Sequence, residues 1–129
     1  MPLKVVPATE ADAPRIVELE HLAYKDDVLT PILFPGPFPE DASAKRADEM
    51  IQQLCSDPTI RWLKVIETGS DEMIAFAKWN VYEAGKPRPK VSGRSYGQGC
   101  NEAACTQFWG VMDEKRQYLM GQIPHVCTL

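Results

Sequence analysis

The stretch RWLKVIETGSDEMIAFAKWNVY, residues 61–82, decides the fold that we predict for this chain. Residues 61–67 and residues 73–82 are apolar runs of strand length, and the polar segment 68–72 separates them. Two such runs around a short polar segment that contains a glycine are typical of an antiparallel hairpin with a longer turn. Both runs carry apolar residues at odd and even positions, so the sequence predicts a sheet with helices on both faces.

A strand and two helical patterns precede this hairpin. The run at residues 3–8 reads as a short first strand that Pro7 ends. Thr9 and Asp12 then form a capping-box pattern for a helix that ends near residues 24–26. The inward face of this helix is predicted to comprise Ile16, Val17, Leu19, Leu22 and Ala23.

Residues 31–39 are rich in proline and aromatic residues and are predicted to be irregular. A second helix is predicted at residues 41–55, before Asp57-Pro58 stops it. Its inward face is predicted to comprise Ala44, Ala47, Met50, Ile51 and Leu54.

The chain after the hairpin begins with a segment that lacks periodicity. Residues 83–99 contain two prolines and four of the eight glycines, which predicts a long loop. Asn101 is a candidate N-cap for a third helix at residues 102–120, which Gly121 ends. Its inward face is predicted to comprise Ala104, Phe108, Val111, Met112 and Leu119, and a last strand is predicted at residues 125–129.

Composition narrows the class of protein. The 129 residues are 44% hydrophobic, which is enough for one domain with a core. A net charge of −4 argues against general binding to nucleic acid or to anionic membranes. No run reaches the length of a membrane span, and no secretory signal precedes the first strand. The four cysteines are irregularly spaced, so we expect reduced thiols and a cytoplasmic protein.

The order strand–helix–helix–hairpin, with RWLKVIE answered by MIAFAKW, resembles the N-terminal half of GNAT-type N-acetyltransferases. The stretch LTPILFPG, residues 29–36, and the stretch from Met112 to PHVCTL, residues 124–129, fit a divergent branch that is common in fungi. The resemblance implies an α/β (α+β) fold: a mostly antiparallel sheet of about four strands covered by helices. Residues 1–129 would form a single partial GNAT-like domain, truncated at its C-terminus.

The family reaction is acetyl transfer from acetyl-CoA to a small-molecule or peptide amine. In the family, the strand that begins near His125 leads into a loop of the type Q/R-x-x-G-x-G/A, which opens a helix. That loop holds the pyrophosphate of acetyl-CoA, because a helix N-terminus is an anion site. Residues 1–129 contain no such loop after His125, so we expect no catalysis by this chain alone.

Candidates for the acceptor side of the cleft come from two segments. The resemblance makes Phe34 and Phe38 substrate-side candidates, whereas aromatic residues in a rigid loop also serve core packing. Trp79 lies near the place where family members open their cleft, and it fits a substrate wall or the core. Glu83 would be a general base if an apolar wall raised its pKa, and a solvated glutamate otherwise.

His125 and Cys127 alternate on one face of the last predicted strand. His125 fits a general base or a hydrogen-bonded structural residue. Two residues without partners cannot make a zinc site, and no orienting Asp or Asn accompanies a cysteine nucleophile, so we predict no metal.

The remaining candidates lie around the long loop. Cys100 and Cys105 flank the start of the third helix, where a thiol pKa falls, although their spacing fits no redox or zinc motif. Gly97-Gln98-Gly99 is a weak imitation of a phosphate loop, because no strand precedes it. A basic run that could meet a phosphate, or remain solvated, comprises Lys86, Arg88, Lys90 and Arg94.

Two other functional interpretations stay open. The chain could be a non-catalytic interaction module that pairs through the exposed edge of its last strand, either as a homodimer or with another partner. It could also be an incomplete version of a longer polypeptide, which the mass of the endogenous protein would reveal.

Overall fold

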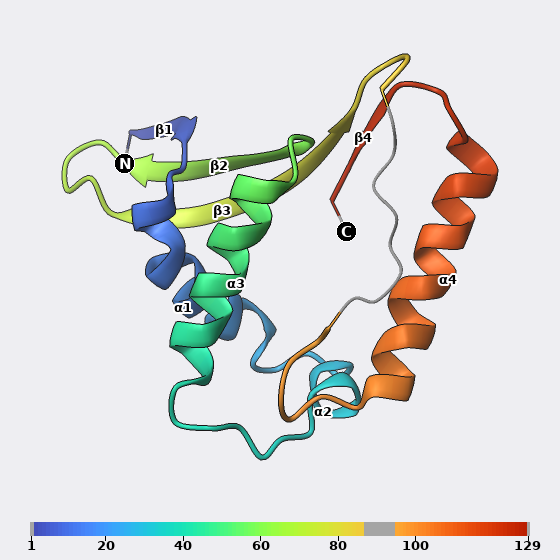
Figure 1. Ribbon diagram of the computed structural model, residues 1–129. Helices are drawn as coiled ribbons and strands as arrows, with labels where there is room; N and C mark the ends of the chain where they lie inside the picture. The colour runs from blue at the N-terminus through green and yellow to red at the C-terminus, as the bar shows by residue number, and fades with distance from the viewer. Residues whose placement is uncertain (1, 87–94, 129) are drawn as a thin grey trace.

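The computed structural model describes residues 2–86 and 95–128. Four strands form one antiparallel sheet in the order β1-β2-β3-β4 (Figure 1). They are β1 (Leu3–Pro7), β2 (Ile60–Glu67), β3 (Met73–Tyr82) and β4 (His125–Cys127). The described helices are the 3₁₀ turn Glu10–Asp12, α1 (Ala13–Tyr24), α2 (Thr30–Leu33), α3 (Ala42–Ser56) and α4 (Glu102–Met120). An α+β fold with a four-stranded antiparallel sheet is therefore confirmed.

The predicted hairpin is the centre of the sheet. Ile60 pairs with Asn80 and Lys64 with Phe76, and this register places the even-numbered residues of both strands on one face. The register shifts next to Val65, where Ile74 of β3 has no partner. The longer turn that joins the strands contains Asp71, whose φ of 56° lies in the left-handed region that aspartate tolerates.

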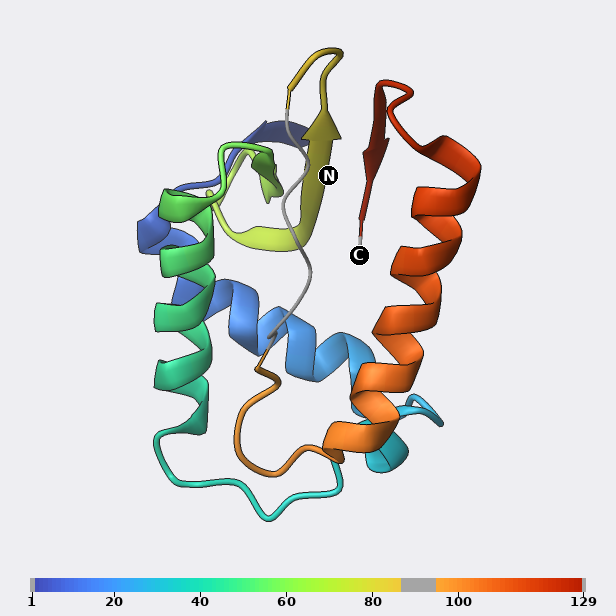
Figure 2. The same cartoon turned by 45° about the vertical axis from the view of Figure 1, so that its right-hand side comes forward.

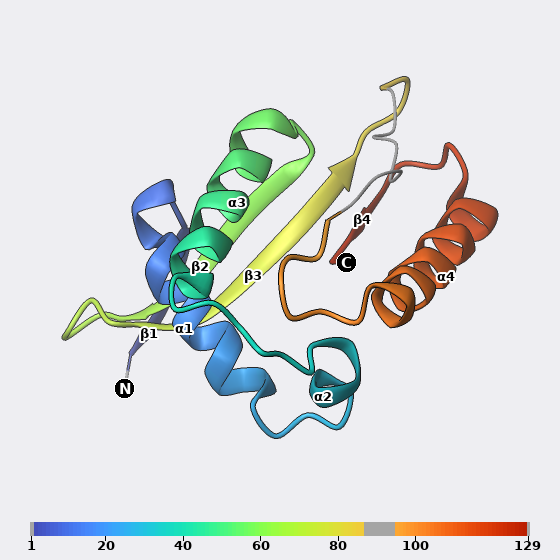
Figure 3. The ribbon, with the colours of Figure 1, turned by 60° about the horizontal axis from the view of Figure 1, so that its bottom comes forward.

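The core lies between one face of this sheet and the helices that connect β1 to β2. Figures 2 and 3 show α1 and α3 packed side by side beneath the strands. Trp62 is buried and meets Phe76 edge to face, with ring centroids 5.7 Å apart. The buried core cluster comprises Ala13, Ile16, Val17, Ala47, Met50, Ile60, Trp62 and Met73.

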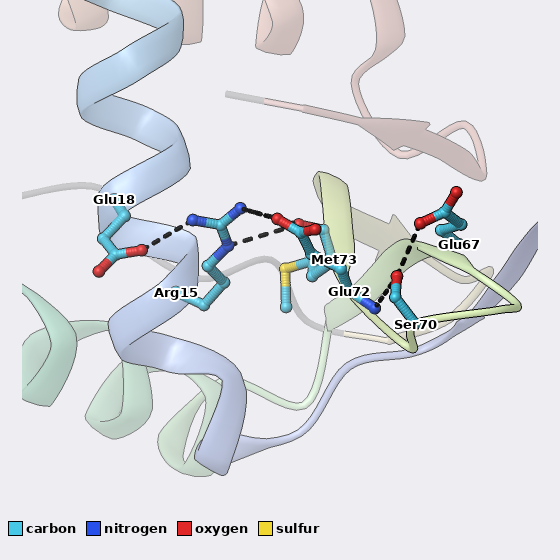
Figure 4. Close-up of polar contacts among 6 residues, drawn as sticks. All are labelled: Arg15, Glu18, Glu67, Ser70, Glu72 and Met73. Carbon is cyan, nitrogen blue, oxygen red and sulfur yellow. Dashed lines mark hydrogen bonds and ion pairs between the residues drawn. The ribbon is translucent and has the colours of Figure 1, made fainter.

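Two basic side chains fasten the first helical segment to the sheet. Lys64 of β2 contacts both carboxylate oxygens of Asp12, at 2.8 and 2.9 Å, and both side chains are mostly buried. Arg15 of α1 donates to the carbonyl oxygen of Met73 and pairs with Glu72, while Glu18 holds its other end (Figure 4). The predicted capping pattern is present in part, because Asp12 accepts a 2.8 Å hydrogen bond from the backbone of Thr9.

The prediction that helices cover both faces of the sheet is not met by the described residues. One face of the sheet carries Trp62 and Tyr82. In the described part of the chain, α1 and α3 pack on this face, and Arg116 of α4 contacts it as well. On the other face Val5 is 63% exposed and Leu63 is 37% exposed. The reason is topological: of the three helices that were predicted to cover the sheet, α1 and α3 belong to the β1–β2 connection and pack together on one face, and α4 reaches that same face through Arg116.

Several predicted inward residues are wrong. In α4, Val111 and Leu119 are 52% and 65% exposed, and only Cys105 is buried among its described residues. Leu22, Ala23 and Ala44 are also exposed, because they lie near the end of α1 and the start of α3, away from the buried core cluster. The segment 31–39 was predicted to be irregular, yet α2 occupies its start. Among the described residues, no helix combines the length and the apolar character needed to cross a membrane.

Candidate functional site

Five titratable side chains lie together where β3 ends and β4 begins, three of them from these strands and two from α4. Tyr82 pairs with His125 across the two strands, and Asn80 pairs with Cys127. The rings of Tyr82 and His125 lie 4.9 Å apart between centroids. From α4, the guanidinium carbon of Arg116 lies 4.8 Å from the centre of the Tyr82 ring. We call Tyr82, Arg116, Asp113, His125 and Cys127 the β3–β4 cluster.

Burial governs the electrostatics of this cluster. Tyr82 is only 8% exposed, and burial, reinforced by the neighbouring Cys127, raises the pKa of its hydroxyl to about 12. Burial acts to lower the pKa of Arg116, but the hydrogen bond to Asp113 and the charge interactions with Tyr82, Asp113 and Cys127 together outweigh burial and raise that pKa above its ordinary value. At neutral pH the cluster therefore contains a neutral phenol and a charged Arg116–Asp113 pair.

Two nitrogen atoms of the cluster are buried and have no hydrogen-bond partner within the described residues. They are Nε of Arg116 and Nε2 of His125. The Nδ1 atom of His125 lies 2.7 Å from the carbonyl oxygen of Ile123. A carbonyl only accepts, so Nδ1 carries the proton and, in the neutral ring, Nε2 carries the free lone pair. The strand thus presents an oriented imidazole whose acceptor nitrogen is unused.

Glu83 is not part of the β3–β4 cluster, although it directly follows Tyr82 in the sequence. Its side chain is exposed and forms a 2.8 Å ion pair with Lys86. The hydrogen bond from Lys86 lowers the pKa of Glu83 below its ordinary value. The apolar wall that would raise the pKa is not found among the described residues, so the geometry favours a solvated carboxylate rather than a general base.

The candidate residues Phe34 and Phe38 lie at the opposite end of α4 from Arg116. The ring of Phe34 is 6.0 Å from that of Trp109, which stacks on Tyr96 at 5.2 Å. The ring of Phe38 covers the backbone of Gly99, where any Cβ would come within 2.7 Å of it. These two phenylalanines therefore hold the α2–α3 connection against the segment before α4, and the structure does not bring them to the β3–β4 cluster.

Trp79 faces away from the β3–β4 cluster. It pairs with Arg61 in the register of the hairpin, on the face opposite to Trp62 and Tyr82, and it is partly exposed. It is not part of the buried core cluster. Trp79 therefore lies neither beside His125, where it would form a substrate wall, nor in the buried core cluster.

The Gly97-Gln98-Gly99 segment does not offer a phosphate cradle. Both glycines have positive φ, but the ring of Phe38 occupies the approach to Gly99. The backbone N–H of Gly36 also donates to the carbonyl oxygen of Gly99, at 2.9 Å. Arg88, Lys90 and Arg94 lie outside the described residues.

The four cysteines, all within the described residues, occupy separate environments and form no disulfide bond with one another. Cys105 is buried and its thiol donates to the carbonyl oxygen of Leu33, whereas Cys100 is partly exposed before α4. The hydrogen bond from the Cys55 thiol to Glu10 raises the pKa of Cys55. No group of three or more metal-ligating side chains exists in the described part of the chain.

Sequence reasoning found His125 and Cys127 but missed the other members of the cluster. Asp113 and Arg116 lie three residues apart on α4, which reads as an ordinary surface pair in a helix. Tyr82 reads as the apolar end of a strand. Only the pairing of β4 with β3 shows that these side chains meet, because it joins residues more than 40 positions apart.

Comparisons with known proteins leave the family open. No family model matches the chain, and neither a curated protein nor a solved structure matches it.

Proposed function

We propose that residues 1–129 form part of a GNAT-like N-acetyltransferase domain of the divergent fungal type, whose reaction is acetyl transfer from acetyl-CoA to an amine. The observation that carries this proposal is the topology. The sheet runs β1-β2-β3-β4 with antiparallel neighbours, and both long helices of the β1–β2 connection lie on one face. This is the element order on which the resemblance rests. A protein of this type would act in the cytoplasm.

His125 is the residue that we propose for acceptor activation. Its buried Nε2 atom is a hydrogen-bond acceptor that no described residue uses, and a buried polar atom of this kind calls for a partner. The N–H of an acceptor amine would be that partner. In the transfer, the amine nitrogen bonds to the acetyl carbon as the carbon–sulfur bond breaks, the sulfur leaves with the bonding electrons as the coenzyme A thiolate, and the amine proton passes to Nε2. Tyr82, which stays protonated at neutral pH, holds the imidazole from one side.

We place the thioester of acetyl-CoA at the outer edge of β4 in this proposal. When bound, acetyl-CoA supplies the activated acetyl group. Within the described residues, the backbone of His125–Cys127 pairs only with β3, so the groups on its other edge can bind a thioester carbonyl or an amide arm. Within residues 2–86 and 95–128 we find no matching feature for the nucleotide end, since Phe38 fills the approach to Gly99. The proposal therefore includes binding of the acyl-pantetheine arm and does not include turnover by residues 1–129 alone.

Thermal melts with three probes test this proposal. We expect acetyl-CoA and acetyl-pantetheine to raise the midpoint similarly, because both carry the arm that β4 would bind. At a hundredfold excess over the Kd the gain is about 2.7 kcal/mol. Adenosine 3′,5′-bisphosphate should leave the midpoint unchanged. A cooperative melt whose midpoint neither acyl probe shifts would contradict the proposal. In a protein that contains the complete cofactor site, a His125→Gln variant that acetylates amines as fast as the natural protein would contradict it as well.

A second candidate function is a non-catalytic interaction module that pairs through β4. The observation that favours it is that β4 is a short edge strand, and Val126 at its centre is 56% exposed. An open strand edge can accept a strand from a partner. Protection of the outer β4 amides from hydrogen exchange by a partner peptide, but not by acetyl-pantetheine, would favour this function over acetyl transfer.

A further inference from the structure

The sheet face that the described helices leave uncovered is apolar along its length. The odd-numbered residues of β2 point to it, and the register places residues of β1 and β3 beside them. Leu63 lies between Pro7 and Ala77, and Val65 lies between Val5 and Ala75. We call this surface the open face; it comprises Leu3, Val5, Pro7, Arg61, Leu63, Val65, Glu67, Ala75, Ala77, Trp79, Val81 and Val126.

The chain exposes far more surface than a compact monomer of its mass. Its accessible surface is 8880 Å² for 14.5 kDa, whereas a folded monomer of this mass exposes about 6,900 Å². The excess of roughly 2,000 Å² belongs to the whole chain, and the open face contributes to it through Val5, Leu63 and Val126, which are 63%, 37% and 56% exposed.

The charges on the open face indicate what covers it. Arg61 and Glu67 are the charged residues of the face, and they stand at opposite ends of β2, about 20 Å apart. Leu63 and Val65 lie between them. Neither charged residue forms an ion pair within the described part of the chain. Such a surface is complementary to itself, because reversing the direction of β2 sets each charge against the opposite one.

We propose that the open face binds a second copy of this chain, with the two sheets stacked face to face. A twofold axis that passes beside residue 64 would bring Arg61 of each copy to Glu67 of the other. The same rotation sets Leu63 of one copy against Val65 of its partner. Sheets stacked in this way lie about 10 Å apart and cross at about 30°, a separation that arginine and glutamate side chains span. This surface is distinct from the edge of β4 and from the β3–β4 cluster.

Sedimentation velocity over a range of concentrations tests the proposal. We expect a species of twice 14.5 kDa, and a Leu63→Asp variant whose dimer dissociation constant rises at least a hundredfold, because a charge replaces the centre of the interface. Leu119→Asp is the matched control, since Leu119 is exposed on α4. A folded natural chain that stays monomeric up to about 100 μM would overturn the proposal, as would a dimer that Leu63→Asp leaves intact.

Charge reversal tests the geometry without placing a charge in the apolar centre. We expect Arg61→Glu and Glu67→Arg each to raise the dissociation constant about tenfold, because each places two like-charged pairs at the ends of the interface. The double variant Arg61→Glu/Glu67→Arg should restore the natural value. Failure of the double variant to dimerise better than either single variant would overturn the antiparallel stacking. Far-UV circular dichroism and a cooperative melt show that each variant is folded.

Discussion

The raised pKa of Tyr82 should make the stability of the fold depend on pH in the alkaline range. Below pH 10 the phenol is protonated in both the folded and the unfolded chain. Between pH 10 and a pKa of about 12, the unfolded chain loses this proton while the folded chain keeps it. The free energy of unfolding should therefore fall as the pH rises through this window. Urea titrations from pH 8 to pH 12 should show that Tyr82→Phe removes this part of the loss. Tyr118→Phe, at a residue that is 84% exposed, is the control and should behave like the natural chain.

Arg116 and Asp113 should behave as one unit when they are mutated. The Asp113 side chain is 14% exposed and the Arg116 side chain 8% exposed. Arg116→Met leaves a carboxylate buried without its partner, and we expect a loss of about 3 kcal/mol in the free energy of unfolding. The double variant Arg116→Met/Asp113→Leu should recover most of that loss, because no buried charge remains. Equilibrium urea unfolding of the four proteins completes the cycle, and additive losses would show that the pair is not coupled.

At the scale of elements, local sequence signals predicted most of the fold. The helix predicted at residues 102–120 and the second hairpin strand match α4 and β3, because Asn101, Gly121 and the apolar runs act locally. The sequence does not predict the start of α2, because Pro31 in a proline-rich segment indicates a loop, although proline is also favoured in the first turn of a helix. The sequence does not predict that Val111 and Leu119 are exposed or that the described helices leave one face of the sheet uncovered, because both depend on which elements pack together. The β3–β4 cluster was missed for the same reason.

The contact between Asp12 and Lys64 joins the start of the helical segment to β2, and it should set the acid stability of that junction. Burial acts to raise the pKa of Asp12, but the hydrogen bonds from Lys64 and Thr9 outweigh it and lower the pKa below 3.8. The carboxylate therefore stabilises the fold above that pH, and its contribution is lost as the pH falls through the lowered value. Asp12→Asn should be less stable than the natural chain at pH 7, and the gap should narrow toward pH 2. Urea unfolding at both pH values measures it; a constant gap would contradict the assignment. Asp41→Asn, at an exposed pair on α3, is the control.

At the scale of the whole molecule, the described chain divides into a well-packed half and a thinly packed one. The buried cluster joins α1, α3 and the hairpin, whereas α4 contributes Cys105 and a few partly buried aromatic residues. Figure 2 shows α4 standing apart from the helices beneath the sheet. The β3–β4 cluster sits at the join between the halves, where Arg116 reaches Tyr82. A site in this position depends on α4 staying attached, so the stability of that attachment bears on any chemistry of His125.

Native-state hydrogen exchange should reveal this division. We expect the amides of α4 to exchange through local opening, at a lower free energy than the amides of β2 and β3, because few buried contacts hold the helix. Phe34→Ala removes the ring that meets Trp109, so it should speed exchange within α4 and leave β2 and β3 unchanged. Phe76→Ala is the matched control: it removes a ring that meets Trp62 in the core, so it should speed exchange across the hairpin and leave α4 unchanged, because global unfolding limits the hairpin whereas local opening limits α4. Equal protection of α4 and the hairpin in the natural chain, measured by mass spectrometry at the same protein concentration, would contradict the division and would mean that α4 unfolds only with the core.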